Sequence, residues 1–554
     1  MKKANPLKWI FKNTKKYFFS LLLITLLSGF FSLGFIALAV ISKNIINIAT
    51  GTATGNITAW IIALAVVVIL QVVSNLLTNH LRVVVTGKLD QHFKQLLFED
   101  MLLKRYSELS KYHTGEIVNR FSSDVDTVIN GVVHIIPNIF SIAVKIVSGI
   151  AVLMAFNTTI ALITIVIGII IILFTCGMSP VFKKYHKSFQ KAQGEVKSII
   201  QESAENITVI KTFTTKKALT ERLVKKMQEW YKIRIKRNHL GNFSGGFLFL
   251  LFTGGYYAIL CWGAFGISNS TLDYGTLMAF LQIVSQIRAP LNNTSSLLVQ
   301  SYSCIASAER LIEFQNMETE PISENFNAKA VYNSLKAIKA ENLEFSYNNE
   351  KYVIKKSDFS ISKGSIVSVT GLSGGGKTTL FRLLLGLFET TNGNLYFECD
   401  DNDIEINSSC RGMFSYVPQG NMILSGTIKD NLTLGKPDVS EENLVNATKT
   451  ACIYDMIEKL PDGFDTVLGE RGLGLSEGQI QRLAIARAII ADAPIILLDE
   501  CTSALDIETE TKILDNIKNL KSKTVLFISH RANTLKICDS VLHMDGGVFT
   551  LERL

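Results

Sequence analysis

A glycine-rich segment in the second half of the chain carries the residues with the clearest chemistry. The β-rich run 365–370 leads into Gly371-Leu-Ser-Gly-Gly-Gly376-Lys377-Thr378-Thr379, and the helix-like run 380–388 follows. This is the pattern G-x-x-x-x-G-K-[ST] between a strand and a helix. Its glycines allow backbone N–H groups to wrap phosphate oxygens, and the helix N-terminus adds its dipole. The segment therefore predicts a nucleotide-binding loop.

Two side chains of this loop have specific expected roles. Lys377 supplies a cation for the β- and γ-phosphates of ATP, and Thr378 offers its hydroxyl to Mg²⁺. ATP and Mg²⁺ are thus the predicted cofactors. The residues predicted to bind ATP here are Gly371, Ser373, Gly374, Gly375, Gly376, Lys377, Thr378 and Thr379.

A second apolar strand ends in two carboxylates. The run Ile-Ile-Leu-Leu at 495–498 is followed by Asp499 and Glu500. A carboxylate at the end of a strand suits Mg²⁺, which we assign to Asp499, and the next carboxylate is placed to polarise the attacking water, which we assign to Glu500. A buried strand can also end in acidic residues for capping alone, so the pair gains its meaning from the nucleotide-binding loop.

These motifs need a domain that brings the ends of several strands together. Residues 336–554 alternate short β-rich runs with helical runs, which is typical of an α/β domain with a mainly parallel sheet. Residues 315–335 are polar, aperiodic and contain Pro321, so they are predicted to form a linker.

The first half of the chain has the composition of a membrane domain. The whole sequence of 554 residues is 48% hydrophobic and only 19% charged, against about a quarter charged in soluble proteins. Six apolar runs are long enough to cross a hydrocarbon core, at residues 18–41, 57–79, 132–156, 158–182, 243–267 and 276–299. Two of these predicted spans contain a charged side chain, Lys145 in the third and Arg288 in the sixth.

The loops between these runs predict the orientation. Long loops rich in both signs of charge, 82–126 and 183–237, alternate with short loops that are neutral or nearly so. By the positive-inside rule both termini are cytoplasmic, and the formal net charge of +8 is explained without a nucleic-acid partner. Residues 1–16 carry lysines around Leu7, Trp9, Ile10 and Phe11, which favours a short interfacial elbow helix over a flexible basic tail.

With these features in place, the sequence resembles the ATP-binding cassette (ABC) transporters. The run Leu475-Ser476-Glu477-Gly478-Gln479 is similar to the signature motif of that family. The resemblance implies that Tyr347 stacks on adenine, that Gln419 contacts Mg²⁺ and senses the membrane domain, and that His530 touches the γ-phosphate. It also implies that Ser503 and Asp506 belong to the D-loop. Catalysis is accordingly assigned to Glu500, His530 and Gln419, and Mg²⁺ contact to Thr378, Gln419 and Asp499.

The first half also resembles the family, in its exporter-type form. Residues 112–124 and 202–213 look like its two intracellular loops, and residues 466–472 look like the loop that touches them. Coupling helices are expected near Gly115–Glu116 and Thr212–Lys217. The implied fold is multi-domain: residues 17–314 form an all-α transmembrane domain of six helices, and residues 336–554 form the α/β P-loop NTPase domain.

One cassette cannot complete an ATP site in this family. The resemblance implies that Leu475, Ser476, Gly478 and Gln479 cap ATP bound to a second cassette, so the chain is expected to dimerise. A homodimer is favoured because the catalytic residues are all present, and a heterodimer with a second half-transporter stays open. The commonest signature motif has glycine at the position of Glu477. We expect a working site, and the sequence does not determine how this difference changes the rate of ATP hydrolysis.

The predicted function is ATP-driven export of a small molecule, lipid or peptide across the cell membrane. An importer on the same fold and an ATP-gated channel or regulator are the alternatives. Lys145 and Arg288 are candidate contacts for an anionic group on an unknown cargo, or else they snorkel toward water. The first span begins near Phe18, so leader-cleaving peptide export is not expected. The richness in Lys, Asn and Ile suggests a bacterial source.

Overall fold

The computed structural model divides the chain into two compact units. The helical unit comprises Met1–Leu102 and His113–Asn316, and the α/β unit comprises Leu103–Tyr112 and Met317–Leu554. The structure describes residues 5–213, 216–321, 326–347, 351–372, 374–420, 423–434, 436, 438–469, 474–520, 522–529 and 531–554. Within these ranges the side chains of residues 172, 176, 179, 183, 186, 288–296, 298 and 532 lie outside the description.

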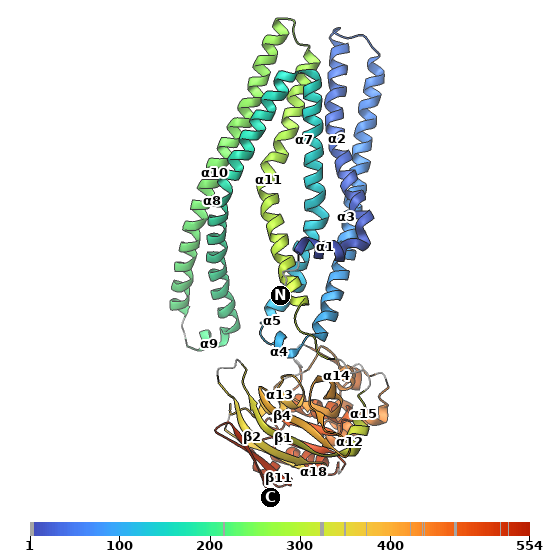
Figure 1. Ribbon diagram of the computed structural model, residues 1–554, viewed down its shortest axis with the longest axis vertical. Helices are drawn as coiled ribbons and strands as arrows, with labels where there is room; N and C mark the ends of the chain where they lie inside the picture. The colour runs from blue at the N-terminus through green and yellow to red at the C-terminus, as the bar shows by residue number, and fades with distance from the viewer. Residues whose placement is uncertain are drawn as a thin grey trace. The chain divides into compact units, whose positions relative to one another are not determined.

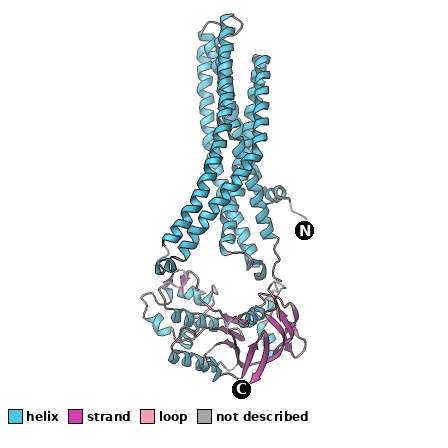
Figure 2. Cartoon of the chain, turned by 90° about the vertical axis from the view of Figure 1, so that its left-hand side faces the viewer, coloured by secondary structure: helices cyan, strands magenta, loops and turns pink. Residues whose placement is uncertain are grey.

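The helical unit is a bundle of long helices (Figures 1 and 2). Short π-helical stretches, 120–124 and 131–135, interrupt the helical run that leads into α7. Its α-helices are α1 (Pro6–Thr14), α2 (Phe18–Ala49), α3 (Ile57–Leu103), α5 (Thr114–Asn119), α6 (Val125–Asn130), α7 (Ile136–Phe156), α8 (Thr158–Glu205), α9 (Ile207–Thr212), α10 (Lys216–Ser268) and α11 (Tyr274–Gln315).

The helices confirm the predicted membrane domain in its main features. Five helical segments in the described residues are long and apolar enough to cross a membrane, and they contain the first five predicted spans. The sixth predicted span lies on α11, where the apolar part Tyr274–Ile287 is followed by side chains outside the description. Several helices run well beyond their apolar part, since α8 has 48 residues and α10 has 53.

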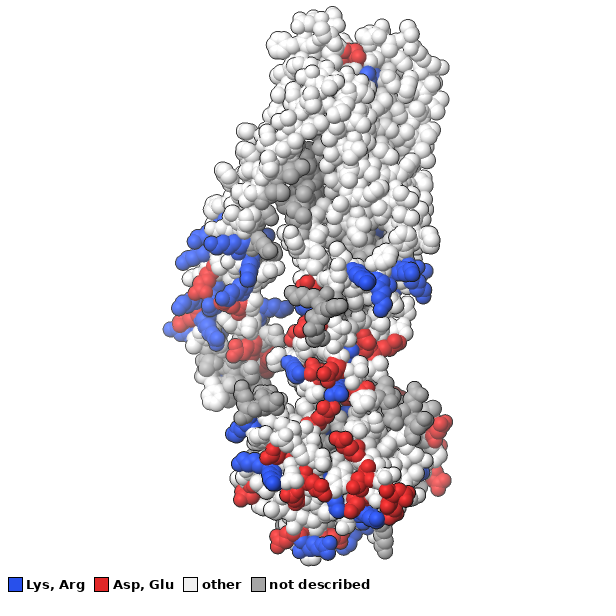
Figure 3. Space-filling view, viewed as in Figure 1, with Lys and Arg blue, Asp and Glu red and all other residues white. Residues whose placement is uncertain are grey.

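Charged side chains are concentrated where the helices run beyond their apolar parts. On the face shown in Figure 3, most of the length of the helical unit carries almost no Lys, Arg, Asp or Glu, while Lys and Arg gather over the ends of α8 and α10 nearest α9. This is the lysine- and arginine-rich stretch 183–237 of the sequence. A helix that is apolar in one part and highly charged in another is suited to span a bilayer and then continue into water.

Helix α1 runs across the bundle instead of along it (Figure 1). Asn5 caps its first turn, Pro6 stands at the first helical position, and both features favour a helix start. Trp9 anchors it by donating from Nε1 to the side-chain oxygen of Gln315 on α11, at 2.7 Å. Leu7 and Phe11 stay exposed, which fits the apolar side of an interfacial helix.

The α/β unit is built on a six-stranded sheet in the order β12-β11-β3-β10-β9-β6. Its strands pair in parallel except β12, which is antiparallel to β11. A four-stranded antiparallel sheet has the order β2-β1-β4-β5. The strands of the two sheets are β1 (Leu335–Phe345), β2 (Ile354–Ser362), β3 (Ile366–Gly371), β4 (Asn392–Cys399), β5 (Ile404–Glu405), β6 (Phe414–Val417), β9 (Ile495–Asp499), β10 (Thr524–Ile528), β11 (Ser540–Asp545) and β12 (Val548–Arg553).

The mainly parallel sheet confirms the predicted α/β domain. Two large apolar clusters form its core: one lies between the two sheets and α13, and the other packs helices α14 to α18 against the parallel sheet. A small sheet pairs β7 (Gly426–Thr427) with β8 (Val467–Leu468). The helices of this unit are α4 (Tyr106–Leu109), α12 (Ala328–Ser334), α13 (Lys377–Leu384), α14 (Ile428–Thr433), α15 (Glu441–Thr450), α16 (Tyr454–Glu458), α17 (Glu477–Ile490), α18 (Ile507–Lys518) and α19 (Ala532–Leu535).

Part of the loop between α3 and α5 belongs to the α/β unit. Lys104 forms a β-bridge with Thr319, and its ammonium group donates to the carbonyl of Met317 at 3.0 Å. Arg105 forms an ion pair with Glu389 at 2.7 Å. The segment Leu103–Tyr112 therefore belongs to the α/β unit, whereas Gly115–Glu116 lies on α5 of the helical unit, where the coupling helix stays a prediction.

The second predicted coupling segment, 212–217, includes residues 214 and 215, which lie outside the described residues. Its first residue ends α9 and its last two begin α10.

Candidate functional site

The glycine-rich loop joins β3 to α13, as the sequence predicted. Gly374 and Gly376 adopt positive φ angles of 75° and 117°, which side chains with a Cβ rarely adopt. A Cβ on Gly376 would also lie 2.7 Å from Met544 Cε and 2.9 Å from Val353 Cγ1. Glycine is required here both by the backbone conformation and by close packing, so the loop can curl tightly ahead of the helix N-terminus.

Lys377 is held inside this loop. It is buried, and its ammonium group donates to the backbone carbonyls of Gly371 at 2.8 Å and Leu372 at 2.9 Å. Burial lowers the pKa of Lys377, and the nearby carboxylates of Glu500 and Asp499 act in the opposite direction. A phosphate group would satisfy this desolvated cation better than two neutral carbonyls.

Asp499 stands at the carboxyl end of β9 and is fully buried. Tyr416 Oη donates to its Oδ2 at 3.5 Å, whereas its Oδ1 is buried without a hydrogen-bond partner in the described part of the chain. Burial raises the pKa of Asp499, and the hydroxyl of Thr378 opposes that shift. An unsatisfied buried carboxylate oxygen beside a hydroxyl suits a hard cation such as Mg²⁺.

The described residues contain no cluster of three or more His, Cys, Asp or Glu that could hold a metal ion by themselves. This fits Mg²⁺, which is usually bound by one or two protein oxygens together with substrate phosphates and water. Asp499 and Thr378 are placed to hold Mg²⁺. Gln419 uses its Nε2 to donate to Glu500, and its amide oxygen is a further candidate ligand. The residues present therefore fit the predicted cofactor.

Glu500 is held by both its backbone and its side chain. Its φ of 49° lies in the left-handed region, which is strained for a residue with a Cβ and is often found at active sites. Its backbone N–H donates to the carbonyl of Ile528 at 2.9 Å, and Gln419 Nε2 donates to its carboxylate at 2.7 Å. The structure thus brings together the predicted base and the predicted glutamine, which follow neighbouring strands β9 and β6.

Tyr347 lies beside the loop but is already engaged. Its hydroxyl forms a 3.0 Å hydrogen bond with the hydroxyl of buried Thr379, and Arg382 donates to it at 3.3 Å. The ring of Phe388 meets the ring of Tyr347 edge-on, with centroids 5.1 Å apart. Tyr347 is still 43% exposed, so part of its ring can receive a base. Thr379, in contrast, is used here to hold Tyr347.

The signature residues form the N-terminus of α17. Ser476 is its N-cap and accepts from the backbone N–H of Gln479 at 3.3 Å, while Gln479 Oε1 accepts from the backbone N–H of Ser476 at 2.8 Å. This capping box fixes where the helix begins. Among the hydrogen bonds described, none joins Leu475, Ser476, Gly478 or Gln479 to the glycine-rich loop of the same chain.

Three residues that the sequence reasoning did not assign hold the D-loop in place. Gln481 donates to the Ser503 hydroxyl at 2.9 Å and accepts from the N–H of Ala504 at 3.1 Å. Arg531 donates to the carbonyls of Ser503 at 2.8 Å and Leu505 at 2.9 Å. It also pairs at 3.1 Å with Glu510, whose side chain is 1% exposed.

Asp506 ends the D-loop as the N-cap of α18, accepting from the N–H of Thr509. The sequence feature that could have identified Arg531 is its position directly after His530. Its partner Glu510 lies in an amphipathic helix and belongs to no motif, so the sequence gave no indication of its role. Two predicted site residues, Ser373 and His530, lie outside the described residues, as does the side chain of Arg288.

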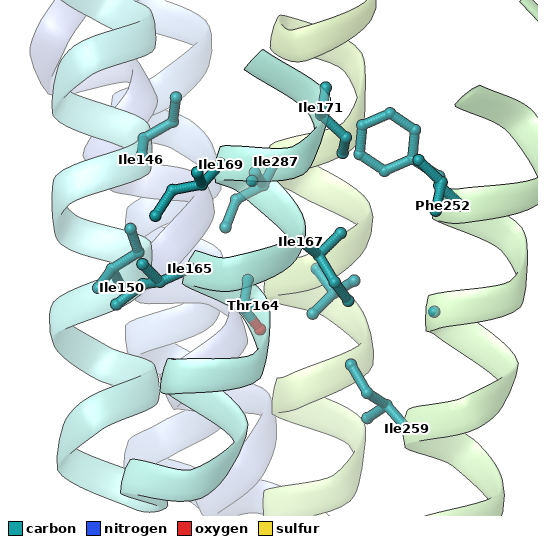
Figure 4. Close-up of a pocket in the computed structure, with 14 residues that line it drawn as sticks. Ile146, Ile150, Thr164, Ile165, Ile167, Ile169, Ile171, Phe252, Ile259 and Ile287 are labelled. Atoms are coloured by element: carbon teal, nitrogen blue, oxygen red, sulfur yellow. The ribbon is translucent and has the colours of Figure 1, made fainter. Parts of the chain in front are cut away.

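An apolar pocket with a volume of about 200 Å³ lies among the described residues of the helical unit (Figure 4). It lies between α7, α8, α10 and α11, and Thr164 supplies the hydroxyl group among its fourteen lining residues. Gly168 and Gly255 help to keep it open, because a Cβ on either would meet at most one side-chain atom within 4 Å. Lys145, the other predicted cargo contact, is adjacent in sequence to the pocket residue Ile146 and places its ammonium group 4.4 Å from the centre of the Phe35 ring.

Comparison with known proteins agrees with this arrangement. Residues 18–291 match the family profile described as ABC transporter transmembrane region, and residues 354–503 match the profile described as ABC transporter. The lactococcin-G-processing and transport ATP-binding protein of Lactococcus lactis is 30% identical over 512 residues, covering 91% of this chain and 71% of that protein. The ATP-dependent lipid A-core flippase of Desulfotalea psychrophila is 29% identical over 469 residues, covering 83% and 81%.

The chain spans about half of a longer relative, ABC transporter B family member 1 of Dictyostelium discoideum, which is 28% identical and of which 55% is covered. Among solved structures, a bacterial Atm1-family ABC exporter with ATP bound has a TM-score of 0.80 at 23% identity. That likeness covers 97% of this chain and 94% of the other, and it shows a shared fold.

Proposed function

Because the chain belongs to the family of ABC transporters, we propose that it is one half of an ATP-driven exporter in the cell membrane. The observation that carries this proposal is the cluster of Lys377, Asp499, Glu500 and Gln419 at the carboxyl edge of a parallel sheet, in one chain with five apolar helices of spanning length in the described residues. The exported cargo is a lipid, small molecule or peptide. The cassette, residues 336–554, and both termini lie on the cytoplasmic side, because the lysine- and arginine-rich loops do.

The hydrolysis step follows from the geometry of the site. Lys377 releases its two carbonyls and holds the β- and γ-phosphates, while backbone N–H groups of the loop surround them. Glu500 polarises the attacking water, and Gln419 orients Glu500 through their 2.7 Å hydrogen bond. Asp499 and Thr378 are the residues that would hold Mg²⁺, which would supply positive charge against the negative charge that develops on the phosphates. His530 is assigned to the γ-phosphate on the family resemblance.

A second cassette completes the site. The described hydrogen bonds of the N-terminus of α17 are made within that helix and not to the glycine-rich loop of the same chain, so we assign Ser476 and Gly478 to cap ATP on a partner chain. We favour a homodimer, since Glu500, Gln419 and Ser476 are all present in this chain. ATP then holds two cassettes together, hydrolysis releases them, and the helical units alternate between inward- and outward-facing forms.

Turnover by the purified chain tests this proposal. In lipid nanodiscs with Mg²⁺, we expect the wild type to hydrolyse ATP and Glu500→Gln to lose about 10²–10⁴-fold in rate while still binding ATP. Glu508→Gln, an exposed carboxylate on α18, is the matched control and should keep wild-type turnover. Absence of turnover in a folded wild type that binds ATP would contradict the homodimer and indicate a heterodimeric partner.

Transport assays separate the proposed exporter from the two alternatives. ATP added to inside-out vesicles should drive cargo uptake into the lumen for an exporter and cargo release for an importer. An ATP-gated channel would equilibrate cargo without accumulating it above the external concentration. Stimulation of ATP turnover by a candidate cargo is the screen that precedes these measurements.

A further inference from the structure

Two segments that lie far apart in the chain pair with each other inside the α/β unit. Residues 103–105 run antiparallel to residues 318–320, with Lys104 and Thr319 directly opposite each other. Two backbone hydrogen bonds, of 3.0 and 2.8 Å, flank this bridge. Lys104 is buried, and its ammonium group donates to the carbonyl of Met317 at 3.0 Å. We call the paired segments 103–105 and 318–320 the clamp.

The clamp joins the ends of two long helices. Segment 103–105 starts with the last residue of α3, and segment 318–320 starts three residues after α11 ends at Gln315. Three residue steps reach at most about 11 Å, so this connection cannot absorb a larger displacement. Within the helical unit, Gln315 also donates to the carboxylate of Asp100 on α3 at 2.8 Å. A displacement of the clamp is therefore passed to both helices.

Arg411 fastens the clamp to the cassette. Its Nη1 and Nη2 atoms donate to the two carboxylate oxygens of Glu320 at 2.5 and 2.7 Å, in the forked geometry that makes arginine–carboxylate pairs strong. The same guanidinium donates to the carbonyls of Leu385 and Gly386 at 3.0 and 3.2 Å, directly after the C-terminal end of α13. Because α13 begins at Lys377, a single helix connects the predicted ATP site to the carbonyls that hold Arg411.

A second contact fastens the other segment of the clamp. Arg105 pairs with Glu389 at 2.7 Å, and the neighbouring Tyr106 packs edge-on against Phe388. The side chain of Glu389 is 76% exposed, whereas that of Glu320 is 15% exposed. Exposed ion pairs contribute little, so the pair between Glu320 and Arg411 is the stronger attachment.

We propose that Glu320 and Arg411 are positioning residues for transport: they attach the clamp to the cassette, so that a movement of α13 on ATP binding displaces α3 and α11 together. This proposal rests on the proposed transport function and names residues that pass the movement to the helices. Breaking the pair should separate two properties of the protein. ATP still binds and is hydrolysed, whereas α3 and α11 no longer respond to it.

Hydrogen–deuterium exchange of the full chain in nanodiscs, measured by mass spectrometry, tests the proposal. Protein without nucleotide is compared with protein trapped by ATP, Mg²⁺ and vanadate, and ATP turnover is measured alongside. In the wild type, we expect trapping to change exchange in the glycine-rich loop and at the ends of α3 and α11. Glu320→Gln keeps the size of the side chain and removes its charge, so it should keep the change in the loop and lose at least about half of the change at both helix ends. Glu320→Asp keeps the charge and should retain more of the response than Glu320→Gln. Glu398→Gln breaks a 2.7 Å pair with Lys339 outside the clamp and should behave as the wild type.

A reversible disulfide tests whether the two segments of the clamp move as one body. Lys104 and Thr319 form a non-hydrogen-bonded antiparallel pair, in which Cα atoms lie about 4.5 Å apart and a disulfide can form. The oxidised and reduced forms of Lys104→Cys/Thr319→Cys should show equal ATP turnover and equal exchange at the ends of α3 and α11. Comparing two forms of one variant removes the effect of losing the Lys104 ammonium group, and oxidised wild type controls for the native cysteines.

Three results would overturn the proposal. A wild-type response of α3 and α11 in Glu320→Gln would show that the pair passes on no movement. Equal losses in Glu320→Gln and Glu398→Gln, or loss of ATP turnover in Glu320→Gln, would show that the pair serves the stability of the cassette alone. Lower turnover in the oxidised disulfide variant than in its reduced form would show that the two segments separate during the cycle. A wild type whose glycine-rich loop does not respond to ATP would instead contradict the proposed function.

Discussion

Replacing Arg531 by alanine should destabilise the cassette and slow ATP turnover. The substitution removes two hydrogen bonds to D-loop carbonyls and leaves the carboxylate of Glu510 buried, with Thr502 as its hydrogen-bond donor among the described residues. Breaking a buried charge pair by removing one partner costs about 3–5 kcal/mol. The Arg531 side chain is 32% exposed, so water screens part of this and we expect a loss of about 2–3 kcal/mol.

The assay is thermal unfolding of the full chain in nanodiscs, followed by differential scanning calorimetry and paired with ATP turnover, because all four tryptophans lie in the helical unit and would not report on the cassette. For a domain of this size a loss of that order lowers the unfolding temperature by about 5–10 °C. Glu510→Gln added to Arg531→Ala should recover much of the loss, because the buried carboxylate is then neutral.

Lys512→Ala is the matched control for this series. It breaks an exposed pair with Glu508 on the same helix and should leave the unfolding temperature unchanged. The reasoning is refuted if Arg531→Ala behaves like Lys512→Ala, or if Glu510→Gln adds a further loss in the Arg531→Ala background.

Three further predictions concern the ATP site. Gly376→Ala forces a Cβ into Met544 and into a strained φ, so ATP affinity, measured with a fluorescent analogue, should fall by about tenfold or more. Asp499→Asn should abolish Mg²⁺-dependent turnover yet raise the unfolding temperature of the nucleotide-free protein. Burial raises the pKa of Asp499 in the folded state, so the stability that its protonated form contributes is complete below pH 3.8 and is lost as pH rises through the folded-state pKa. Asparagine is neutral at every pH and avoids this loss. An unfolding temperature that does not rise would contradict this sign. Ser476→Ala should cost about 0.5–2 kcal/mol through loss of the capping box, measured by chemical denaturation, and Ser476→Thr should restore most of it; equal losses would show that the cap with Gln479 is unimportant.

Sequence reasoning located the strands and loops of the ATP site because its motifs are local. A strand, a glycine-rich turn and a helix start are encoded within a few residues, and parallel strands bring their carboxyl ends to one edge of a sheet. The pairing of Gln419 with Glu500 follows from that rule, since β6 and β9 are neighbours. The long apolar helices were predictable for a similar reason, as hydropathy over some twenty residues suffices to detect a span.

Contacts between distant residues were not predictable in this way. Glu510 lies on the buried face of α18, where an apolar residue is the usual expectation, and only its pairing with Arg531 explains the carboxylate. Thr379 stays predicted to bind ATP, and the motif gave no sign of the hydrogen bond that its hydroxyl forms with Tyr347. The assignment of Leu103–Tyr112 to the α/β unit was not predictable either, because no motif in that segment indicates its contacts with Met317, Thr319 and Glu389.

Aromatic packing joins Tyr347, which is predicted to stack on adenine, to the loop between α3 and α5. Tyr106 meets Phe388 edge-on with ring centroids 5.6 Å apart, and the same Phe388 meets Tyr347 at 5.1 Å. Tyr347 in turn is bonded to Thr379 on the helix that begins at the phosphate loop. An adenine stacked on Tyr347, as the family resemblance implies, would contact the first of three rings that end at Tyr106 and that come from three separate parts of the chain.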